Sequence, residues 1–155
     1  MAEDWTLPWA GGCRCGRLRF RVEAPPLLTM ACHCRGCQQM TGSAFSLSVA
    51  VPEAGFSVTS GEPVIGGLHG AHRHFFCDHC KSWVFTRPDG LGDFVNIRAT
   101  LLDDATWVVP FVETQTAEAL PWALTPAPHS FERWPPMEEF PAFIEAFARE
   151  GARPR

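Results

Sequence analysis

Seven cysteines gather in three short clusters, and the chain has no other cysteine. The clusters are Cys13-Arg-Cys15, Cys32-His-Cys34-Arg-Gly-Cys37 and Cys77-Asp-His-Cys80. Thiolates prefer soft or borderline metal ions, and zinc is the ion that we expect. Four thiolates complete a tetrahedral zinc site, whereas three leave one position open for a further ligand. Two pairs and a triplet therefore suggest one structural zinc and one reactive zinc.

The spacing inside each cluster suits metal ligands. Cys13 and Cys15 lie two residues apart, so in an extended segment their side chains share one face. The Cys77-x-x-Cys80 spacing is typical of a turn that presents two thiolates together. The triplet combines both patterns, because a turn after Cys32-x-Cys34 brings the third thiol back beside the first two.

Spacing alone leaves the division between ions open. A ribbon-like closed site of Cys34, Cys37, Cys77 and Cys80 would also be possible, and it would leave the three other cysteines without a role. An iron–sulfur cluster is the main competing occupant. Disulfides fit poorly, because the number of cysteines is odd and no secretion signal is visible.

Histidines near the clusters are candidates for supporting roles. His33 lies inside the triplet and is the candidate proton relay, although packing is the plainer interpretation. The others lie before or within the last pair and can be extra ligands, but a plain loop is expected there: His69, His72, His74 and His79. The last pair also has the spacing of a thioredoxin-type redox motif, which should open a helix. The following residues 83–85 instead have the pattern of a strand.

Composition bounds the class of protein. With 155 residues and 46% hydrophobic content, the chain can form one domain with its own core. Its net charge of −4, scattered arginines and single lysine argue against a nucleic-acid surface. The N-terminus lacks a signal-peptide pattern, and no apolar stretch reaches the roughly 18 residues of a membrane span. We therefore expect a cytoplasmic protein with no membrane partner, whose thiols stay reduced.

The expected elements are mostly strands. Two-residue alternation predicts strands at residues 18–22, 45–51, 74–77, 83–85, 94–97 and 108–112. Residues 121–136 are rich in Pro and Trp and are expected to wrap the body as a loop. Helical spacing occurs near the C-terminus, where Phe140, Phe143, Ile144 and Phe147 share one face and Pro141 suits the first turn.

The order of the clusters resembles the glutathione-dependent formaldehyde-activating enzyme family. The resemblance rests on Gly12-Cys13-Arg-Cys15-Gly16, Cys32-His33-Cys34-x-x-Cys37 and Phe76-Cys77-x-x-Cys80, and it spans about residues 9–122. Softer matches are Val95-Asn-Ile-Arg98, Leu101-Leu-Asp-Asp104, Pro110 and Pro121-Trp122. One departure is Lys81, because the family usually has Gly after the final cysteine.

The resemblance implies a mostly β, tent-like, zinc-stabilised fold with a short C-terminal helix. It places the zinc-binding domain at residues 9–125, with residues 126–155 as a loop and helix packed on it. It implies a structural zinc on Cys13, Cys15, Cys77 and Cys80 and a catalytic zinc on Cys32, Cys34 and Cys37, or about two zinc ions per chain. The implied reaction joins a small thiol, glutathione or similar, to formaldehyde or a related aldehyde, as a carbon–sulfur lyase does in reverse.

The chemistry of the triplet agrees with such a reaction. A zinc ion with three thiolates carries a net charge of −1, so it acidifies water less than a three-histidine zinc does, yet it still holds a substrate thiol as thiolate. The zinc deaminase and His-Glu-x-x-His protease signatures are absent from the sequence. Two other classes stay open: a non-catalytic zinc-stabilised binding module, which would fill the fourth position with a protein ligand, and a thiol redox sensor that releases zinc on oxidation. The oligomeric state is left open.

Overall fold

Two β-sheets form most of the protein. The computed structural model describes residues 2–68 and 70–155. The smaller sheet has three strands in the order β1-β2-β5, namely β1 (Trp9–Gly12), β2 (Arg19–Val22) and β5 (Phe56–Ser60). The larger has eight in the order β11-β10-β3-β4-β9-β8-β7-β6, namely β11 (His129–Ser130), β10 (Val112–Thr114), β3 (Leu28–Cys32), β4 (Ser46–Pro52), β9 (Phe94–Arg98), β8 (Trp83–Pro88), β7 (His72–Cys77) and β6 (Pro63–Gly66).

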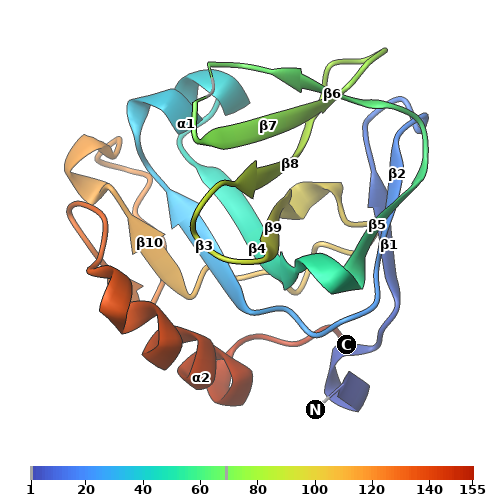
Figure 1. Ribbon diagram of the computed structural model, residues 1–155. Coiled ribbons are helices and arrows are strands. Elements are labelled where there is room, and N and C mark those ends of the chain that lie inside the picture. Colours follow the sequence, from blue (N-terminus) through green and yellow to red (C-terminus); the bar gives the residue numbers. More distant parts are fainter. Residues whose placement is uncertain (1, 69) are drawn as a thin grey trace.

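Helices are few and short. The two α-helices are α1 (Arg35–Thr41) and α2 (Phe140–Glu150). Single 3-10 turns occur at η1 (Ala2–Trp5), η2 (Glu53–Gly55), η3 (Ala99–Leu101), η4 (Thr116–Glu118) and η5 (Met137–Glu139). The predicted mostly β fold with a C-terminal helix is thereby confirmed (Figure 1). No helix in the described part of the chain has the length and apolar character needed to cross a membrane.

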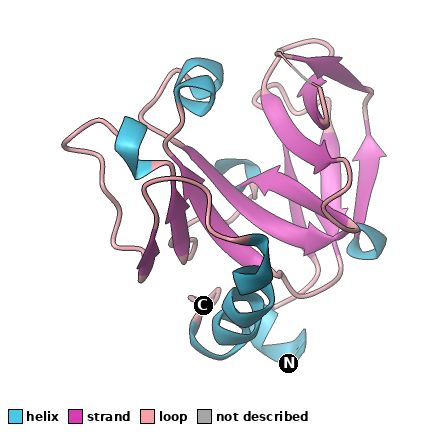
Figure 2. Ribbon diagram, turned by 60° about the vertical axis from the view of Figure 1, so that its left-hand side comes forward, coloured by secondary structure: helices cyan, strands magenta, loops and turns pink. Residues whose placement is uncertain are grey.

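The core lies between the two sheets. On β4 the buried residues Val49 and Val51 alternate with serine and alanine, as strand periodicity requires. The sheets meet through Phe56 of β5 and Phe85 of β8, whose ring centroids are 4.9 Å apart. Figure 2 shows the two layers of strands with α2 beneath them. One face of the large sheet is therefore apolar and covered.

The opposite face of the large sheet carries polar side chains. In the β3–β4 ladder Cys32 pairs with Ser46, and in the β4–β9 ladder Ser48 pairs with Arg98. Directly paired residues and residues two apart on a strand point to the same face. A cysteine, two serines and an arginine therefore share the face opposite Val49 and Val51.

Strand direction brings the cluster residues to one end of this sheet. β3 and β9 are both antiparallel to β4, and β7 and β9 are both antiparallel to β8. The strands β3, β9 and β7 therefore run in the same direction and end on the same side of the sheet. Their last residues are Cys32, Arg98 and Cys77. The α1 helix follows β3 at this edge (Figure 1).

The structure corrects two expectations about local structure. The strand expected at residues 108–112 is wrong for residues 108–111, because Val108 N–H bonds to Ala105 O in a turn and Pro110 has no N–H to give to a ladder. Its three-residue strand β10 begins only at Val112. The loop expected around the later histidines is also wrong at His72, because β7 begins there, two residues before the strand predicted at residues 74–77.

The C-terminal helix is confirmed, and it closes one end of the core. Phe143 and Phe147 are its buried residues. The Phe147 ring lies 5.6 Å from that of Trp5 and 5.5 Å from that of Phe111. The 121–136 segment is largely loop as expected, apart from β11. The division of the chain at residue 125 stays a prediction.

Candidate metal centres

The first half of the four-cysteine centre is a tight turn after β1. Cys13 N–H donates to Leu18 O at 2.9 Å, and Leu18 N–H donates to Cys13 Sγ at 3.3 Å. Gly16 closes the turn at φ +82°, a conformation that glycine adopts without steric cost. The turn therefore holds Cys13 buried and leaves Cys15 at the surface.

The second half is the turn between β7 and β8. Cys77 ends β7, its Sγ accepts Cys80 N–H at 3.5 Å, and its carbonyl accepts Lys81 N–H at 3.0 Å. Lys81 has φ +60°, in the left-handed region that favours glycine. The glycine that the family resemblance leads one to expect here would adopt this conformation without steric cost. Ser82 Oγ lies 3.2 Å from Cys80 Sγ and accepts Arg14 N–H at 3.3 Å, which joins the two turns.

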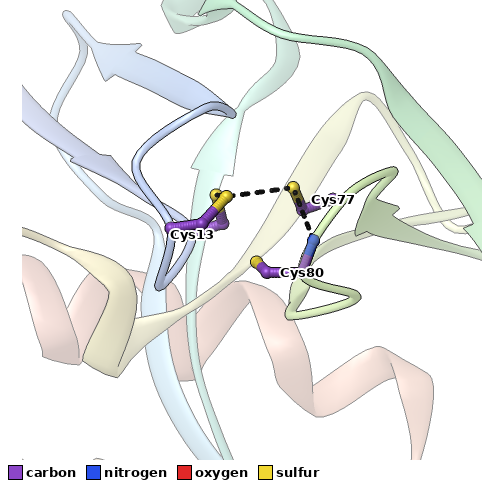
Figure 3. A group of neighbouring side chains, drawn as sticks. Cys13, Cys77 and Cys80 are labelled. Atoms are coloured by element: carbon purple, nitrogen blue, oxygen red, sulfur yellow. Dashed lines mark hydrogen bonds between the residues drawn. The ribbon is translucent and has the colours of Figure 1, made fainter.

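The two turns place four sulfur atoms around one point. The sulfur atoms of Cys13, Cys15, Cys77 and Cys80 all lie within 4.8 Å of one another. The distance from Cys15 Sγ to Cys77 Sγ is 3.8 Å. Zinc–sulfur bonds of about 2.3 Å in a tetrahedron require sulfur atoms roughly 3.8 Å apart. Figure 3 shows Cys13 on one turn facing Cys77 and Cys80 on the other. The donor set fits a four-coordinate metal ion.

The three-cysteine centre forms where β3 passes into α1. Cys32 is the last residue of β3, Cys34 is the N-cap of α1, and Cys37 lies in its first turn. Their sulfur atoms lie within 4.8 Å of one another. Sequence reasoning expected a turn after Cys34, and the turn is the start of this helix. Its capping bond runs from Cys37 N–H to Cys34 Sγ at 3.3 Å.

Hydrogen bonds and burial make the three thiols unequal. A hydrogen bond from Cys37 lowers the pKa of Cys32 to about 5. The same bond, together with burial, raises the pKa of Cys37, and burial raises the pKa of Cys34. One thiolate is thus favoured, while a second and a third need a cation beside them. This requirement is what a metal site provides, and it shows that the cluster fits a metal ion.

A polar network holds the segment between the ligands. His33 is fully buried, and its Nε2 lies 2.8 Å from Glu113 Oε1. Gln38 Nε2 donates to the carbonyl of His33 at 2.7 Å and to that of Glu118 at 2.9 Å. Burial raises the pKa of Glu113, but hydrogen bonds from Thr125 and His33 outweigh it and leave the pKa below its usual value. The network fixes the backbone that carries two of the three cysteines.

Residues that sequence reasoning did not single out contact or flank the cluster. Ser46 donates its hydroxyl to Cys37 Sγ at 3.1 Å. Arg98 is only 8% exposed, and its guanidinium carbon lies 4.0 Å from the ring centroid of Trp83. The ladder register that brings Ser46 and Arg98 to this face has no signal in the sequence. Sequence reasoning did not single out Glu113, because the predicted strand ended at residue 112, one residue before it.

The remaining candidate histidines do not enter either sulfur cluster. His72 and His79 are exposed, and His74 Nδ1 lies 2.9 Å from Thr86 Oγ1. His69 lies outside the described residues. Across residues 2–68 and 70–155, neither group of candidate ligands includes a histidine or a carboxylate.

Comparison with known proteins agrees with this geometry. A family model described as glutathione-dependent formaldehyde-activating enzyme matches residues 8–118. No curated protein matches the chain. Among solved structures, the chain is similar to a crystal structure of a Rhodobacter sphaeroides protein, with 17% identity and a TM-score of 0.51 over 61% of this chain and 87% of that one. At this identity the structural likeness shows a shared fold alone.

Proposed function

Since this chain belongs to the glutathione-dependent formaldehyde-activating enzyme family, we propose that it is a zinc-dependent carbon–sulfur lyase or synthase. It joins a small thiol, glutathione or similar, to formaldehyde or a related aldehyde. The observation that carries the proposal is the gathering of three sulfur atoms within 4.8 Å where β3 meets α1, apart from a second group of four. A three-sulfur site can accept a further ligand, whereas a four-sulfur site is complete.

The two groups take different roles in this proposal. Cys13, Cys15, Cys77 and Cys80 hold a structural zinc that fastens the loop after β1 to the β7–β8 turn. Cys32, Cys34 and Cys37 hold the reactive zinc. Zinc bound there supplies positive charge that stabilises the thiolate form of a substrate thiol at neutral pH. An iron–sulfur cluster is the competing occupant of the first group, because a tetrahedral set of four sulfur atoms suits either metal, and elemental analysis separates the two.

The reaction needs a nucleophilic sulfur from the thiol and an aldehyde whose oxygen accepts a proton and becomes a hydroxyl group. The substrate sulfur uses one lone pair to form a bond to the aldehyde carbon. The π electrons of the carbonyl move to its oxygen, which takes up one proton. Because the thiol has lost one proton, the reaction changes the total number of protons by zero. The product is an S-hydroxymethyl hemithioacetal when the aldehyde is formaldehyde, and the reverse steps release the aldehyde. No oxidant or reductant is involved.

The chain's own residues keep the protein sulfurs as ligands. The Ser46 hydroxyl and the Cys37 N–H donate hydrogen bonds to the sulfurs of Cys37 and Cys34, and such bonds reduce charge on thiolate sulfur. The substrate thiolate is then the better nucleophile of those present. His33 is buried against Glu113, and this arrangement favours a role in holding the ligand loop over one in proton relay.

The seven cysteines form no disulfide among the described residues, and reduced cysteines favour a cytoplasmic location.

The experiment is a measurement of condensation rate. Zinc-loaded protein is mixed with formaldehyde and glutathione at neutral pH, and magnetisation exchange between free and hydroxymethylated glutathione is followed by NMR. We expect exchange faster than in buffer, and loss of the effect in Cys34→Ser. If the wild-type protein, with full zinc content, accelerates exchange for neither glutathione nor other small thiols, the enzyme proposal is wrong and the binding-module interpretation gains.

A further inference from the structure

We propose that Arg98 forms an anion-binding subsite beside the three-cysteine centre and selects thiols that carry a carboxylate. This inference rests on the proposed function and specifies its substrate class. The carboxylate of the bound thiol pairs with the guanidinium while its sulfur lies at the cluster. Arg98 is thus a specificity-determining residue that contacts substrate away from the reacting atoms.

The first observation is a buried cation without a hydrogen-bonding partner. Arg98 is 8% exposed, yet none of the ion pairs or side-chain hydrogen bonds among the described residues includes its guanidinium. Its Nε is buried and unsatisfied. Burying an arginine without a carboxylate or a carbonyl to receive its donors costs several kcal/mol. The free protein therefore has a guanidinium group whose unpaired donors a ligand can satisfy.

A second unsatisfied group lies on the same strand and face. Asn96 precedes Arg98 by two residues on β9, and its Oδ1 is also buried without a hydrogen-bond partner. Residues two apart on a strand point the same way. Buried polar atoms are nearly always satisfied in folded proteins, so both exceptions point to a polar ligand. A carboxylate would satisfy the Arg98 donor, whereas the Asn96 acceptor needs a donor from the ligand, such as a peptide N–H.

The sheet brings this face to the cluster. Arg98 pairs with Ser48, and Ser48 lies two residues from Ser46, which pairs with Cys32. Strands about 4.8 Å apart and a residue rise of about 3.3 Å place the Cα atoms of Arg98 and Cys32 roughly 12 Å apart. The long arginine side chain can reach across part of this distance, so one small molecule could contact both the guanidinium and the cluster. The charges of Cys37 and Cys32 also act on Arg98, where they oppose the burial that lowers its pKa to about 10.

The guanidinium is held in place rather than free to swing. It lies 4.0 Å from the ring centroid of Trp83, close enough for a cation–π contact. Trp83 is itself fixed, because its Nε1–H donates to Thr86 Oγ1 at 3.1 Å. A stacked guanidinium keeps its N–H edge available for two parallel bonds to a carboxylate. This geometry suits a planar anion better than a neutral group.

The test measures binding without aldehyde, by titration calorimetry on zinc-loaded protein. The probes are 3-mercaptopropionate against its uncharged amide, and glutathione against its diethyl ester. The variants are Arg98→Gln, Arg98→Lys, and the matched control Arg73→Gln, whose arginine pairs with Asp89 at the surface of the same sheet. Zinc content and melting temperature are measured for each. Comparing variants with the wild type cancels the difference in thiol pKa between each acid and its neutral partner.

We expect Arg98→Gln to weaken binding of the acids by about ten- to a hundred-fold, the range of a charge-assisted pair, and to leave the neutral thiols within about two-fold. Arg98→Lys should recover part of the loss, and Arg73→Gln should behave as wild type. Equal weakening of acids and neutral thiols in Arg98→Gln would show that the arginine only balances the charge of the metal cluster, and would overturn the proposal.

Wild-type measurements decide the matter if Arg98→Gln does not fold. A wild-type protein that binds each acid no better than its neutral partner, after each affinity is corrected for the thiol's own pKa, contradicts the subsite. The proposed function fails separately: a protein that binds thiol acids selectively but does not speed condensation would keep the subsite and lose the enzyme. A protein that condenses charged and neutral thiols equally well would keep the enzyme and lose the subsite.

Discussion

Ionisation of the thiols and binding of a metal ion would be coupled at the three-cysteine centre. The pKa of Cys32 lies at about 5, so this thiol is ionised at neutral pH. The pKa values of Cys34 and Cys37 are raised, so these two are protonated until a cation displaces their protons. The cysteines themselves could be predicted from sequence, because ligand type and spacing are local. The partners Ser46, Glu113 and Arg98 could not, because they arrive through strand register.

Metal binding at this centre should therefore release about two protons near neutral pH. Protons compete with the metal for the two raised thiols, so affinity rises with pH and falls as the solution is acidified. Calorimetry in buffers of different ionisation enthalpy measures the number, with Cys34→Ser subtracting the four-cysteine centre. A release near zero would mean that the three thiols do not bind the metal together.

Lys81 carries strain that glycine would relieve. A φ of +60° costs a residue with a side chain roughly 1–2 kcal/mol. Glycine avoids this cost, but its greater freedom in the unfolded chain offsets part of the gain in stability. We expect Lys81→Gly to raise the free energy of unfolding by about 0.5–1 kcal/mol, seen as a melting temperature about 2–3 °C higher in zinc-containing buffer. Lys81→Ala is the control: it removes the exposed pair with Asp78 but keeps the strain, and it should give no gain.

Elements with a long periodic pattern were predictable, whereas short ones were not. The helix at Phe140–Glu150 and the strand at Ser46–Pro52 follow their apolar spacing. The α1 helix has seven residues, and its first turn is occupied by ligands, so it shows no apolar stripe. Strand β10 is three residues long and fully buried, which leaves no alternation to detect. Length and two-sided burial are thus what limited the prediction.

The α2 helix should matter for stability more than for the metal centres. Phe147 is completely buried against Trp5 and Phe111, and α2 lies at the opposite end of the molecule from α1 (Figure 1). We expect Phe147→Ala to lower the free energy of unfolding by about 3–5 kcal/mol and to leave the zinc content of the folded protein unchanged. Denaturant unfolding with parallel metal analysis checks both. Glu145→Ala, at an exposed position of the same helix, should change stability by less than about 0.5 kcal/mol; similar losses in both variants would refute the packing argument.

Across the whole molecule, topology gives the two centres different duties. The four-cysteine centre joins the chain near residue 13 to the turn near residue 80, so a metal ion bound there would close a long loop between two sheets. The three-cysteine centre spans only six residues around the β3–α1 junction. We therefore expect that removing a ligand from the first disturbs tertiary structure, and that removing one from the second disturbs the proposed chemistry.

Matched serine substitutions should separate these duties. Cys77→Ser loses a metal whose binding contributes directly to folding, so we expect insoluble protein or a strongly lowered melting temperature. Cys34→Ser should stay folded, lose condensation activity and retain about one zinc ion per chain. Thermal denaturation and elemental analysis of both variants provide the comparison. Equal melting temperatures would show that the cysteines are divided between the ions in another way.

Cobalt substitution tests most directly whether the metal of Cys32, Cys34 and Cys37 takes a substrate thiol. Cobalt bound to thiolates absorbs in the near ultraviolet and visible, so a fourth sulfur ligand changes the spectrum. We predict that glutathione changes the spectrum of the cobalt-loaded wild type, more strongly as pH rises toward the thiol pKa, and leaves that of Cys34→Ser unchanged. A wild-type spectrum that neither glutathione nor 3-mercaptopropionate alters would contradict the account, because the site would then have no open position for a thiol.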